Sequence, residues 1–340
     1  MSDNSAVPLL SVQGLTAKYA LRGSSRRFIF AVDGISFDIW PGETLGLVGE
    51  SGCGKSTTGR SILRLVQPTA GSVRFQGIDV TALSKTEFRE IRRKMQLVFQ
   101  DPYASLNPRM PVGEAVGEPL LNFGLGDAKA RRQRVADLFA RVGLRADLMD
   151  KLPHEFSGGQ RQRIGIARAL SVDPSLIVAD EPVSALDVSV QAQVINLLMD
   201  IQRERRIAYL FIAHDLAVVQ HVSHRVAIMY LGRIVELAET QALFDEPLHP
   251  YTEALLASVP NPDPDATRVT PKVAGEIPSP IDRPSGCHFH TRCPYVIEDC
   301  TTVVPLLREV RPGHHVACHL RSPATARAID PTASVDNGDY

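Results

Sequence analysis

Short runs of almost unbroken apolar residues mark the centre of this chain. There are four of them: Thr44 to Val48, Met95 to Phe99, Leu176 to Ala179 and Ala208 to Ala213. Strands of a parallel sheet have this pattern, because helices cover both of their faces. The segments between the runs are long enough to hold helices. We therefore predict an α/β fold around a central parallel sheet.

The N-terminal block has a different pattern, in which apolar and polar residues roughly alternate. A strand-like segment, Leu9 to Gln13, is followed by apolar side chains at Val32, Ile35, Phe37 and Ile39. Alternation of this kind predicts a sheet with one face in water.

Helical spacing of apolar residues occurs in two other stretches. Between residues 128 and 144, Val135, Leu138, Phe139 and Val142 fall on one helix face, and a second stripe lies between residues 190 and 201. The first stretch belongs to a predicted helical insertion at about residues 101–170. Packing against a core is sufficient to explain the second.

The segment 49–57 reads Gly-Glu-Ser-Gly-Cys-Gly-Lys-Ser-Thr and fits G-x-x-x-x-G-K-[ST] between a buried strand and a helical segment. Its glycines let backbone N–H groups surround phosphate oxygens, and the helix N-terminus adds its dipole. The lysine would supply charge to the β- and γ-phosphates, and the serine hydroxyl would ligate Mg²⁺. The predicted phosphate-binding residues are Gly49, Ser51, Gly52, Cys53, Gly54, Lys55, Ser56 and Thr57.

The third apolar run ends in two carboxylates, Asp180 and Glu181. In a P-loop hydrolase, the first would lie beside Mg²⁺ as the Walker B acid. The second would orient and deprotonate the attacking water. A solvated acidic strand end is the simpler interpretation of this segment alone, but the phosphate-binding motif favours a catalytic one.

A third motif, Phe156 to Gln162, lies just before the acidic strand, and the joint arrangement resembles the nucleotide-binding domains of ATP-binding cassette (ABC) proteins over residues 8–255. The resemblance implies a Q-loop glutamine at Gln100, in contact with Mg²⁺ and the reaction, and a switch histidine at His214. It also implies an adenine-stacking aromatic at Tyr19, although Phe28 and Phe30 are close by. The implied signature motif and D-loop acid are Ser157, Gly158, Gly159, Gln160 and Asp187.

The family closes the signature motif of one subunit over ATP held by the P-loop of another. Because this chain has one copy of each motif, the resemblance implies a partner ATPase subunit, either a paralogue or a second copy. The signature begins with Phe156, where leucine is commoner in the family, but the serine and glycines that would touch phosphate are present.

The C-terminal third resembles that of oligopeptide/dipeptide importer ATPases, at Leu248 to Thr252, Gly275 to Pro280 and Ser285 to Cys287. The resemblance implies two membrane permease subunits and an extracytoplasmic solute-binding protein as partners. Seven prolines in residues 260–284 predict an extended connector. We expect an ATPase domain at 1–258, the connector and a Cys-rich region at 259–325, and a disordered tail at 326–340.

Four of the five cysteines fall near the C-terminus, at Cys287, Cys293, Cys300 and Cys318. Clustered cysteines in a reducing compartment suggest metal ligation rather than disulfides. The resemblance implies that they hold a [4Fe-4S] cluster. Zinc stays open because five histidines share the segment, and so does a set of thiols without a ligand.

Composition narrows the class of protein further. The 340 residues carry 37 Lys and Arg against 38 Asp and Glu, a net charge of −1, so no overall basic field favours nucleic-acid binding. No apolar run approaches the length of a membrane span, and the N-terminus lacks the pattern of a secretory signal. We expect a peripheral location on the cytoplasmic face of the plasma membrane.

The motifs together predict an α/β P-loop ATPase with a helical subdomain and a small Cys-rich extension, which drives a bacterial importer of peptides or related solutes. Soluble ABC ATPases of translation or DNA repair are the alternative class, but they usually carry tandem cassettes or long coiled coils. An adaptor that binds ATP without hydrolysing it is disfavoured by Asp180, Glu181 and His214.

Overall fold

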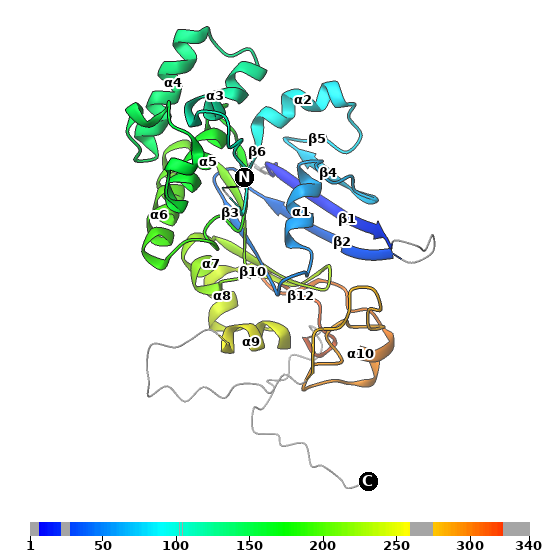
Figure 1. Cartoon of the computed structure of the whole chain (residues 1–340). Coiled ribbons are helices and arrows are strands. Elements are labelled where there is room, and N and C mark those ends of the chain that lie inside the picture. Colours follow the sequence, from blue (N-terminus) through cyan, green and yellow to red (C-terminus); the bar gives the residue numbers. More distant parts are fainter. Residues whose placement is uncertain (1–6, 22–27, 102, 104, 259–274, 322–340) are drawn as a thin grey trace, which may run out of the picture.

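The computed structural model describes residues 7–21, 28–101, 103, 105–258 and 275–321. Over these ranges two sheets and their flanking helices form the molecule (Figure 1). The predicted α/β class is confirmed. None of the helices in the described ranges is long and apolar enough to cross a membrane. The expected tail at 326–340 lies outside the described residues.

The larger sheet has eight strands in the order β11-β12-β10-β9-β3-β8-β7-β6. From β9 to β6 all neighbours are parallel, whereas β10, β12 and β11 continue the sheet in antiparallel fashion. The four predicted runs are its strands β3, β6, β7 and β8, and three of them are buried at every residue. Its strands are β3 (Thr44–Val48), β6 (Met95–Val98), β7 (Leu176–Asp180), β8 (Ala208–Ala213), β9 (Arg225–Tyr230), β10 (Arg233–Glu239), β11 (Arg308–Arg311) and β12 (His314–Val316).

The smaller sheet is antiparallel, in the order β2-β1-β4-β5, and its strands alternate between buried and more exposed positions as predicted. It faces the larger sheet across a core that also includes helix α1. Its strands are β1 (Leu10–Ala20), β2 (Phe28–Ile39), β4 (Ala70–Phe75) and β5 (Ile78–Asp79).

Helices cover both faces of the larger sheet because its central strands are apolar on both sides. Helix α1 (Lys55–Ile62) lies between the two sheets, and a second core forms on the opposite face. The stripe predicted between residues 190 and 201 lies on α6, where it packs into this second core. Outside the helical subdomain and the C-terminal region, the other helices are α2 (Lys85–Lys94), α6 (Val188–Arg205), α7 (Leu216–Val222), α8 (Thr240–Asp245) and α9 (Pro250–Ala257).

The predicted insertion forms a group of helices beyond the β6 edge of the sheet (Figure 1). Helices α3, α4 and α5 pack on one another, and Val135, Leu138, Phe139 and Val142 are buried among them. Its elements are α3 (Val112–Asn122), α4 (Ala128–Arg141), η1 (Ala146–Leu148), η2 (Pro153–Glu155) and α5 (Gly158–Leu170).

The C-terminal region packs directly against the ATPase core. Strand β12 pairs with β10, so the region extends the central sheet, and Phe289 is 1% exposed within the main core. Residues 275–284 of the predicted connector contain no helix or strand, and its earlier part lies outside the described residues. The region also contains α10 (Glu298–Thr302) and η3 (His319–Arg321).

Candidate active site

The phosphate-binding loop connects β3 to α1, as the motif predicted. A Cβ atom on Gly54 would lie 1.9 Å from the carbonyl oxygen of Ala31, and its φ of +111° also favours glycine. The Lys55 ammonium donates hydrogen bonds to the carbonyl oxygens of Gly49 at 2.7 Å and Glu50 at 3.1 Å. The lysine is therefore held across the loop whose backbone would surround phosphate.

Cys53 lies on the inner side of this loop and is 4% exposed. Burial raises the pKa of its thiol, although Lys55 nearby acts to lower it. A protonated thiol is a poor nucleophile, so the loop cysteine acts here as a small packing residue.

Two oxygen ligands suited to Mg²⁺ meet beside the loop. The Ser56 hydroxyl donates to Asp180 Oδ1 at 2.7 Å, and Asp180 is 2% exposed at the end of β7. Arg60, which is not among the predicted site residues, lies 3.6 Å from Asp180 Oδ2. A hydroxyl and a carboxylate side by side fit the hard oxygen coordination that Mg²⁺ requires.

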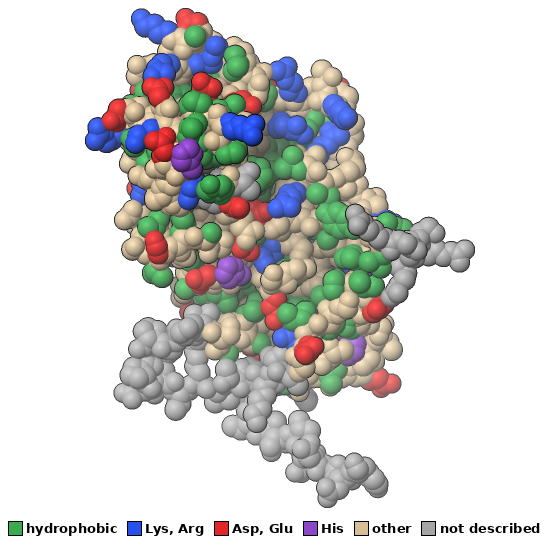
Figure 2. All heavy atoms as spheres, in the orientation of Figure 1, with side chains coloured by type: hydrophobic (Ala, Val, Ile, Leu, Met, Phe, Trp, Pro, Cys, Tyr) green, Lys and Arg blue, Asp and Glu red, His purple; other side chains and the backbone are tan. Residues whose placement is uncertain are grey.

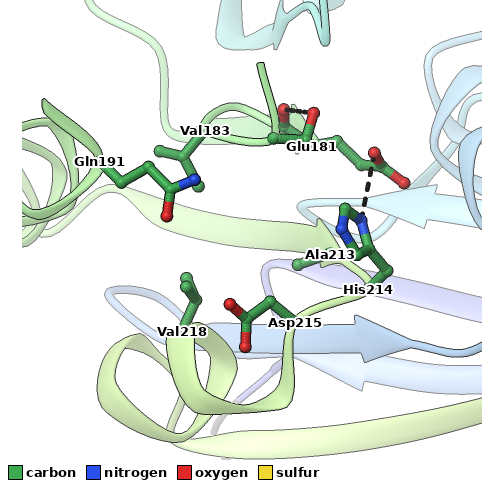
Figure 3. Close-up of a pocket in the computed structure, with 8 residues that line it drawn as sticks. Glu181, Val183, Gln191, Ala213, His214, Asp215 and Val218 are labelled. Carbon is green, nitrogen blue, oxygen red and sulfur yellow. Dashed lines mark hydrogen bonds and ion pairs between the residues drawn. The ribbon is translucent and has the colours of Figure 1, made fainter. Parts of the chain in front are cut away.

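Three residues predicted to act in hydrolysis converge from separate elements. Gln100 Nε2 donates to Glu181 Oε2 at 2.9 Å. His214 Nδ1 lies 3.4 Å from the same oxygen, and Figure 3 shows this contact between His214 and Glu181. Glu181 and His214 also line one pocket, together with Val183, Ser184, Gln191, Ala213, Asp215 and Val218.

The backbone at Glu181 is held in an unusual conformation. Its φ is +46°, in the left-handed region that side-chain-bearing residues seldom adopt. Its N–H donates to Ile212 at 3.0 Å, and the Ser184 hydroxyl donates to its carbonyl at 3.1 Å. Such a conformation persists only where the surroundings enforce it, and functional sites are common places for it.

The predicted signature motif begins α5, with Ser157 as the N-cap. The Ser157 hydroxyl accepts from the Gln160 N–H at 3.3 Å, and Gln160 Oε1 accepts from the Ser157 N–H at 2.9 Å. This capping box leaves Ser157 exposed. Among the hydrogen bonds of the described residues, none joins residues 157–160 to the phosphate-binding loop.

The two remaining predicted nucleotide contacts, Asp187 and Tyr19, lie in other elements. Asp187 is the N-cap residue of α6 and follows the loop that begins at Glu181. Tyr19 lies on β1 and is 42% exposed. Of its two alternatives, Phe28 has Lys18 Nζ 4.7 Å from its ring centre, and Phe30 has the Arg283 guanidinium at 4.4 Å.

Sequence reasoning missed two side chains that contact Glu50 of the phosphate-binding loop and hold the loop in place. Arg292 pairs with Glu50 at 2.9 Å, and the Tyr251 hydroxyl accepts the Glu50 N–H at 2.9 Å. Arg292 is separated from Glu50 by 242 positions, so spacing gave no signal of their contact. Tyr251 falls in the Leu248 to Thr252 segment, which the resemblance marks as a family feature without a role.

The four C-terminal cysteines lie in a shared, partly buried environment. Burial raises the pKa of Cys293 to about 11 and of Cys318 to about 12, with smaller contributions from the neighbouring thiols. No group of three or more His, Cys, Asp or Glu side chains in the described ranges is placed to hold a metal ion. The predicted iron–sulfur or zinc site is therefore not supported by the side-chain geometry.

The histidines of this region are largely engaged within the protein. His314 Nε2 lies 2.7 Å from the buried Glu236 carboxylate, His290 Nδ1 lies 2.8 Å from the Cys287 carbonyl, and His319 Nε2 lies 2.8 Å from the Val303 carbonyl. Burial lowers the pKa of His288 to about 4. Three of the five histidines are thus engaged with the protein, whereas the buried Nδ1 atoms of His288 and His315 have no hydrogen-bond partner among the described residues.

Comparison with known proteins agrees with this geometry. Residues 32–184 match the family model "ABC transporter", and residues 235–300 match "Oligopeptide/dipeptide transporter, C-terminal region". The "Probable peptide ABC transporter ATP-binding protein y4tS" of Sinorhizobium fredii is 53% identical over 96% of this chain and 93% of its own length. The "Oligopeptide transport ATP-binding protein AppF" of Bacillus subtilis is 53% identical over 86% of this chain and 90% of its own.

Solved structures support the ABC cassette part of this assignment. A structure described as "Dimeric structure of a post-hydrolysis state of the ATP-binding cassette MJ0796 bound to ADP and Pi" superposes with a TM-score of 0.62 at 29% identity, and the match covers 68% of this chain and 98% of that one. The chain therefore belongs to the ABC transporter ATP-binding proteins, in the group with the oligopeptide/dipeptide transporter C-terminal region.

Proposed function

We propose that this chain is the ATP-hydrolysing subunit of a bacterial ABC importer for peptides or related small solutes. The observation that carries the proposal is the convergence of Gln100 and His214 on one oxygen of Glu181, next to the paired Ser56 and Asp180. An acidic strand end with a purely structural role would not require these contacts to Glu181 and Asp180. Phosphate release from Mg-ATP by the purified chain, with its partner subunit where one is required, tests it directly.

The chemistry assigned to Glu181 follows from its hydrogen bonds. Gln100 and His214 both approach Oε2, and among the described residues no hydrogen bond is made to Oε1. That oxygen is the one free to accept a proton from a water molecule that attacks the γ-phosphorus. Gln100 and His214 orient the carboxylate, and His214, 59% exposed, is also free to donate to the γ-phosphate.

Mg²⁺ would be held by Ser56 and Asp180, with Gln100 as a further oxygen ligand. When bound, the ion neutralises charge on the phosphates. The loop residues Gly49 to Thr57 would bind the phosphates through their N–H groups and Lys55. Tyr19 would stack on the adenine.

A second subunit would complete each ATP site. Ser157, Gly158 and Gly159 lie at the start of α5, where exposed N–H groups and a hydroxyl form an anion site without a lysine. The solved cassette MJ0796 is described as dimeric with ADP and phosphate bound, which supports the same assembly here. The partner is a paralogous ATPase subunit or a second copy, with Asp187 near the shared boundary.

The membrane partners would be two permease subunits that receive solute from an extracytoplasmic binding protein. A groove of about 500 Å³ lies between α3 and α4 on the helical subdomain, with Met110, Leu121, Arg131 and Asp150 among its lining residues. A short permease helix would fit such a groove and would place the chain on the cytoplasmic face of the membrane. The groove combines apolar and charged lining, which suits an amphipathic helix.

Copurification separates transport from the alternative class of soluble ABC ATPases. Recovery of the chain with polytopic membrane proteins supports the importer, whereas recovery with ribosomes or DNA at moderate salt overturns it. On the face seen in Figure 2, positive and negative side chains are intermixed, and the net charge of the chain is −1, so neither observation favours nucleic-acid binding.

We also propose that Cys287, Cys293, Cys300 and Cys318 ligate a [4Fe-4S] cluster, with zinc as the alternative. The main-chain bond from the Cys287 N–H to the Cys300 carbonyl, at 2.9 Å, and the Tyr295 N–H that donates to Cys293 Sγ support a shared site. Side-chain rearrangement would be required, since the present thiol positions do not form a metal-binding group. Iron and sulfide analysis after anaerobic purification tests the proposal, and chains free of both iron and zinc would reject it.

A further inference from the structure

Arg292 connects the C-terminal region to the phosphate-binding loop. Its Nη1 atom lies 2.9 Å from Glu50 Oε2, and its Nη2 atom lies 3.2 Å from Glu50 Oε1. The two side chains are only 12% and 24% exposed. A bidentate pair shielded from water is stronger and more directional than an exposed one.

Aromatic side chains fix the position of this arginine. Its guanidinium lies 5.9 Å from the ring centre of Tyr230 and 5.8 Å from that of Phe289. Phe289 is itself buried against Tyr230 and Tyr251 at 5.3 and 5.4 Å. Burial alone would lower the pKa of Arg292, but hydrogen bonds with Glu50 and Tyr230 outweigh it and raise the pKa, so the arginine stays charged.

Glu50 is held at three points, and one of them reaches the lysine of the loop. Its carboxylate accepts from Arg292, its N–H donates to the Tyr251 hydroxyl at 2.9 Å, and its carbonyl accepts from Lys55 Nζ at 3.1 Å. A displacement of Glu50 would therefore also displace the hydrogen-bond partner of Lys55. The arginine is placed to control the geometry of the loop as well as its charge.

The charge of Glu50 is unfavourable for the ligand of this loop. A carboxylate one residue after Gly49 repels a triphosphate, and in a partly desolvated site such repulsion is poorly screened. Arg292 cancels that charge and directs the carboxylate toward the C-terminal region. Without the arginine, an unpaired anion would remain in the loop.

We propose that Arg292 is a positioning residue of the nucleotide site, which neutralises and anchors Glu50 so that the C-terminal region sets the affinity of the loop for Mg-ATP. This inference rests on the proposed function, since it requires the loop to bind a nucleoside triphosphate. It assigns to the C-terminal region a part in ATP binding that acts through Glu50 of the loop.

The test is equilibrium binding of Mg-ATP by isothermal titration calorimetry, with steady-state phosphate release as a second readout. We expect Arg292→Met to weaken binding about tenfold, equivalent to about 1.4 kcal/mol. KM should rise while kcat stays within about threefold, because the loop binds the phosphates in ground and transition states alike. Glu50→Gln removes the carboxylate charge but keeps a side chain that can accept a hydrogen bond from Arg292, so it should weaken binding less than Arg292→Met does.

The double variant Glu50→Gln with Arg292→Met is decisive, because it removes the unpaired carboxylate. We expect it to recover binding to within about threefold of the wild type. Arg321→Met is the matched control: Arg321 pairs with Glu253 at 3.4 Å at 16% and 19% exposure, in the same region but away from the loop. It should bind Mg-ATP like the wild type.

If the wild type binds Mg-ATP normally, three outcomes would overturn this inference but leave the proposed function standing. They are an unchanged affinity in Arg292→Met, no recovery of affinity in the double variant, or an equal loss of affinity in Arg321→Met. Thermal melts check folding. If Arg292→Met does not fold, Arg292→Lys replaces it, with an expected intermediate loss that Glu50→Gln relieves; no loss, or a loss without relief, would overturn the inference. A folded wild type that binds no Mg-ATP would overturn the proposed function and this inference with it.

Discussion

Two loops begin helices in different ways: a first loop, the phosphate-binding residues 49–57, and a second loop, the signature motif at residues 157–160. Helix α1 starts at a left-handed Gly54 with no side-chain cap, so its first N–H groups remain available to a ligand. Helix α5 starts with a capping box in which Ser157 and Gln160 satisfy each other's backbone. The first loop is prepared for an anion that arrives from solution, and the second is stable without one.

The two loops also differ in charge and in the side chains that hold them in place. Lys55 is 4% exposed inside the first loop, and Tyr251 and Arg292 hold that loop from behind. The signature loop lies on the surface and contains no cation between residues 157 and 160. The comparison teaches that one loop should bind nucleotide by itself, whereas the other contributes only after a second subunit brings it against bound ATP.

Glu181→Gln should have the largest effect on turnover. It separates the hydrolysis step from nucleotide binding at the first loop. The amide keeps the shape of the side chain but cannot accept the proton of water, so turnover should fall by about 10²- to 10⁴-fold. Phosphate release measures the loss, and Mg-ATP affinity should be unchanged. Light scattering should show an ATP-dependent dimer that outlasts that of the wild type.

Glu90→Gln, at an exposed position on α2, is the control and should hydrolyse ATP normally. Hydrolysis by Glu181→Gln at the wild-type rate would remove Glu181 from its catalytic role. Loss of nucleotide binding in the same variant would mean that the carboxylate instead supports the loop.

Acid should lower the stability of the fold around His249, which caps the helix that carries Tyr251. Burial lowers the pKa of His249 to about 4, with Glu236 acting to raise it and Arg321 to lower it. Because the unfolded chain takes up this proton near pH 6.5, the stabilisation is complete above that pH and is lost as pH falls toward 4, up to about 3 kcal/mol. Thermal melts between pH 7.5 and 4.5 measure it.

His249→Asn sharpens that measurement. His249 Nδ1 accepts the Tyr251 N–H at 3.0 Å as the N-cap of α9, and asparagine can cap in its place without titrating. The variant should lose stability less steeply with acid than the wild type. Identical slopes would show that His249 does not control this part of the pH dependence.

Gly158→Asp should damage the second loop and spare the first. A Cβ atom there meets Leu186 at 3.6 Å, an ordinary contact, and a carboxylate is favourable at a helix N-terminus, so α5 should fold. The added charge would repel the ATP carried by the partner. Turnover should fall at least about tenfold, and the ATP-dependent dimer of Glu181→Gln should not form.

Mg-ATP affinity of the isolated Gly158→Asp subunit should stay within about twofold of the wild type, as measured by calorimetry. Ala128→Asp adds the same charge at the start of α4 and should hydrolyse ATP normally. A dimer that forms as readily with Gly158→Asp would contradict the division of labour between the two loops.

The sequence pattern predicted those parts of the site that depend on residues close together in the chain. The buried runs became β3, β6, β7 and β8 because apolar strands need cover on both faces, and the loop spacing located Lys55 and Ser56. Chain topology, which those runs imply, then brought Gln100, Glu181 and His214 together.

The contacts that escaped prediction depend on long-range packing. Nothing in the segment around Arg292 indicates that its partner is Glu50, because a charge carries no information about a residue 242 positions away. Phe289 reads as one apolar residue in a polar segment, yet it is buried in the main core. Cysteine spacing likewise predicts a class of ligand but not whether the thiols converge.

Tyr19 should give the smallest effect, confined to nucleotide affinity at the first loop. Its ring is 42% exposed on β1, whereas Lys18 and Arg283 already lie over Phe28 and Phe30. Loss of stacking of about 0.5–1.5 kcal/mol predicts an increase of about 2- to 12-fold in the KM for ATP in Tyr19→Ala. Tyr19→Phe keeps the ring and should match the wild type, and neither variant should alter kcat. If Phe30→Ala raised KM while Tyr19→Ala did not, the adenine would lie against the strand opposite Tyr19, and the first loop would bind its nucleotide in a different orientation.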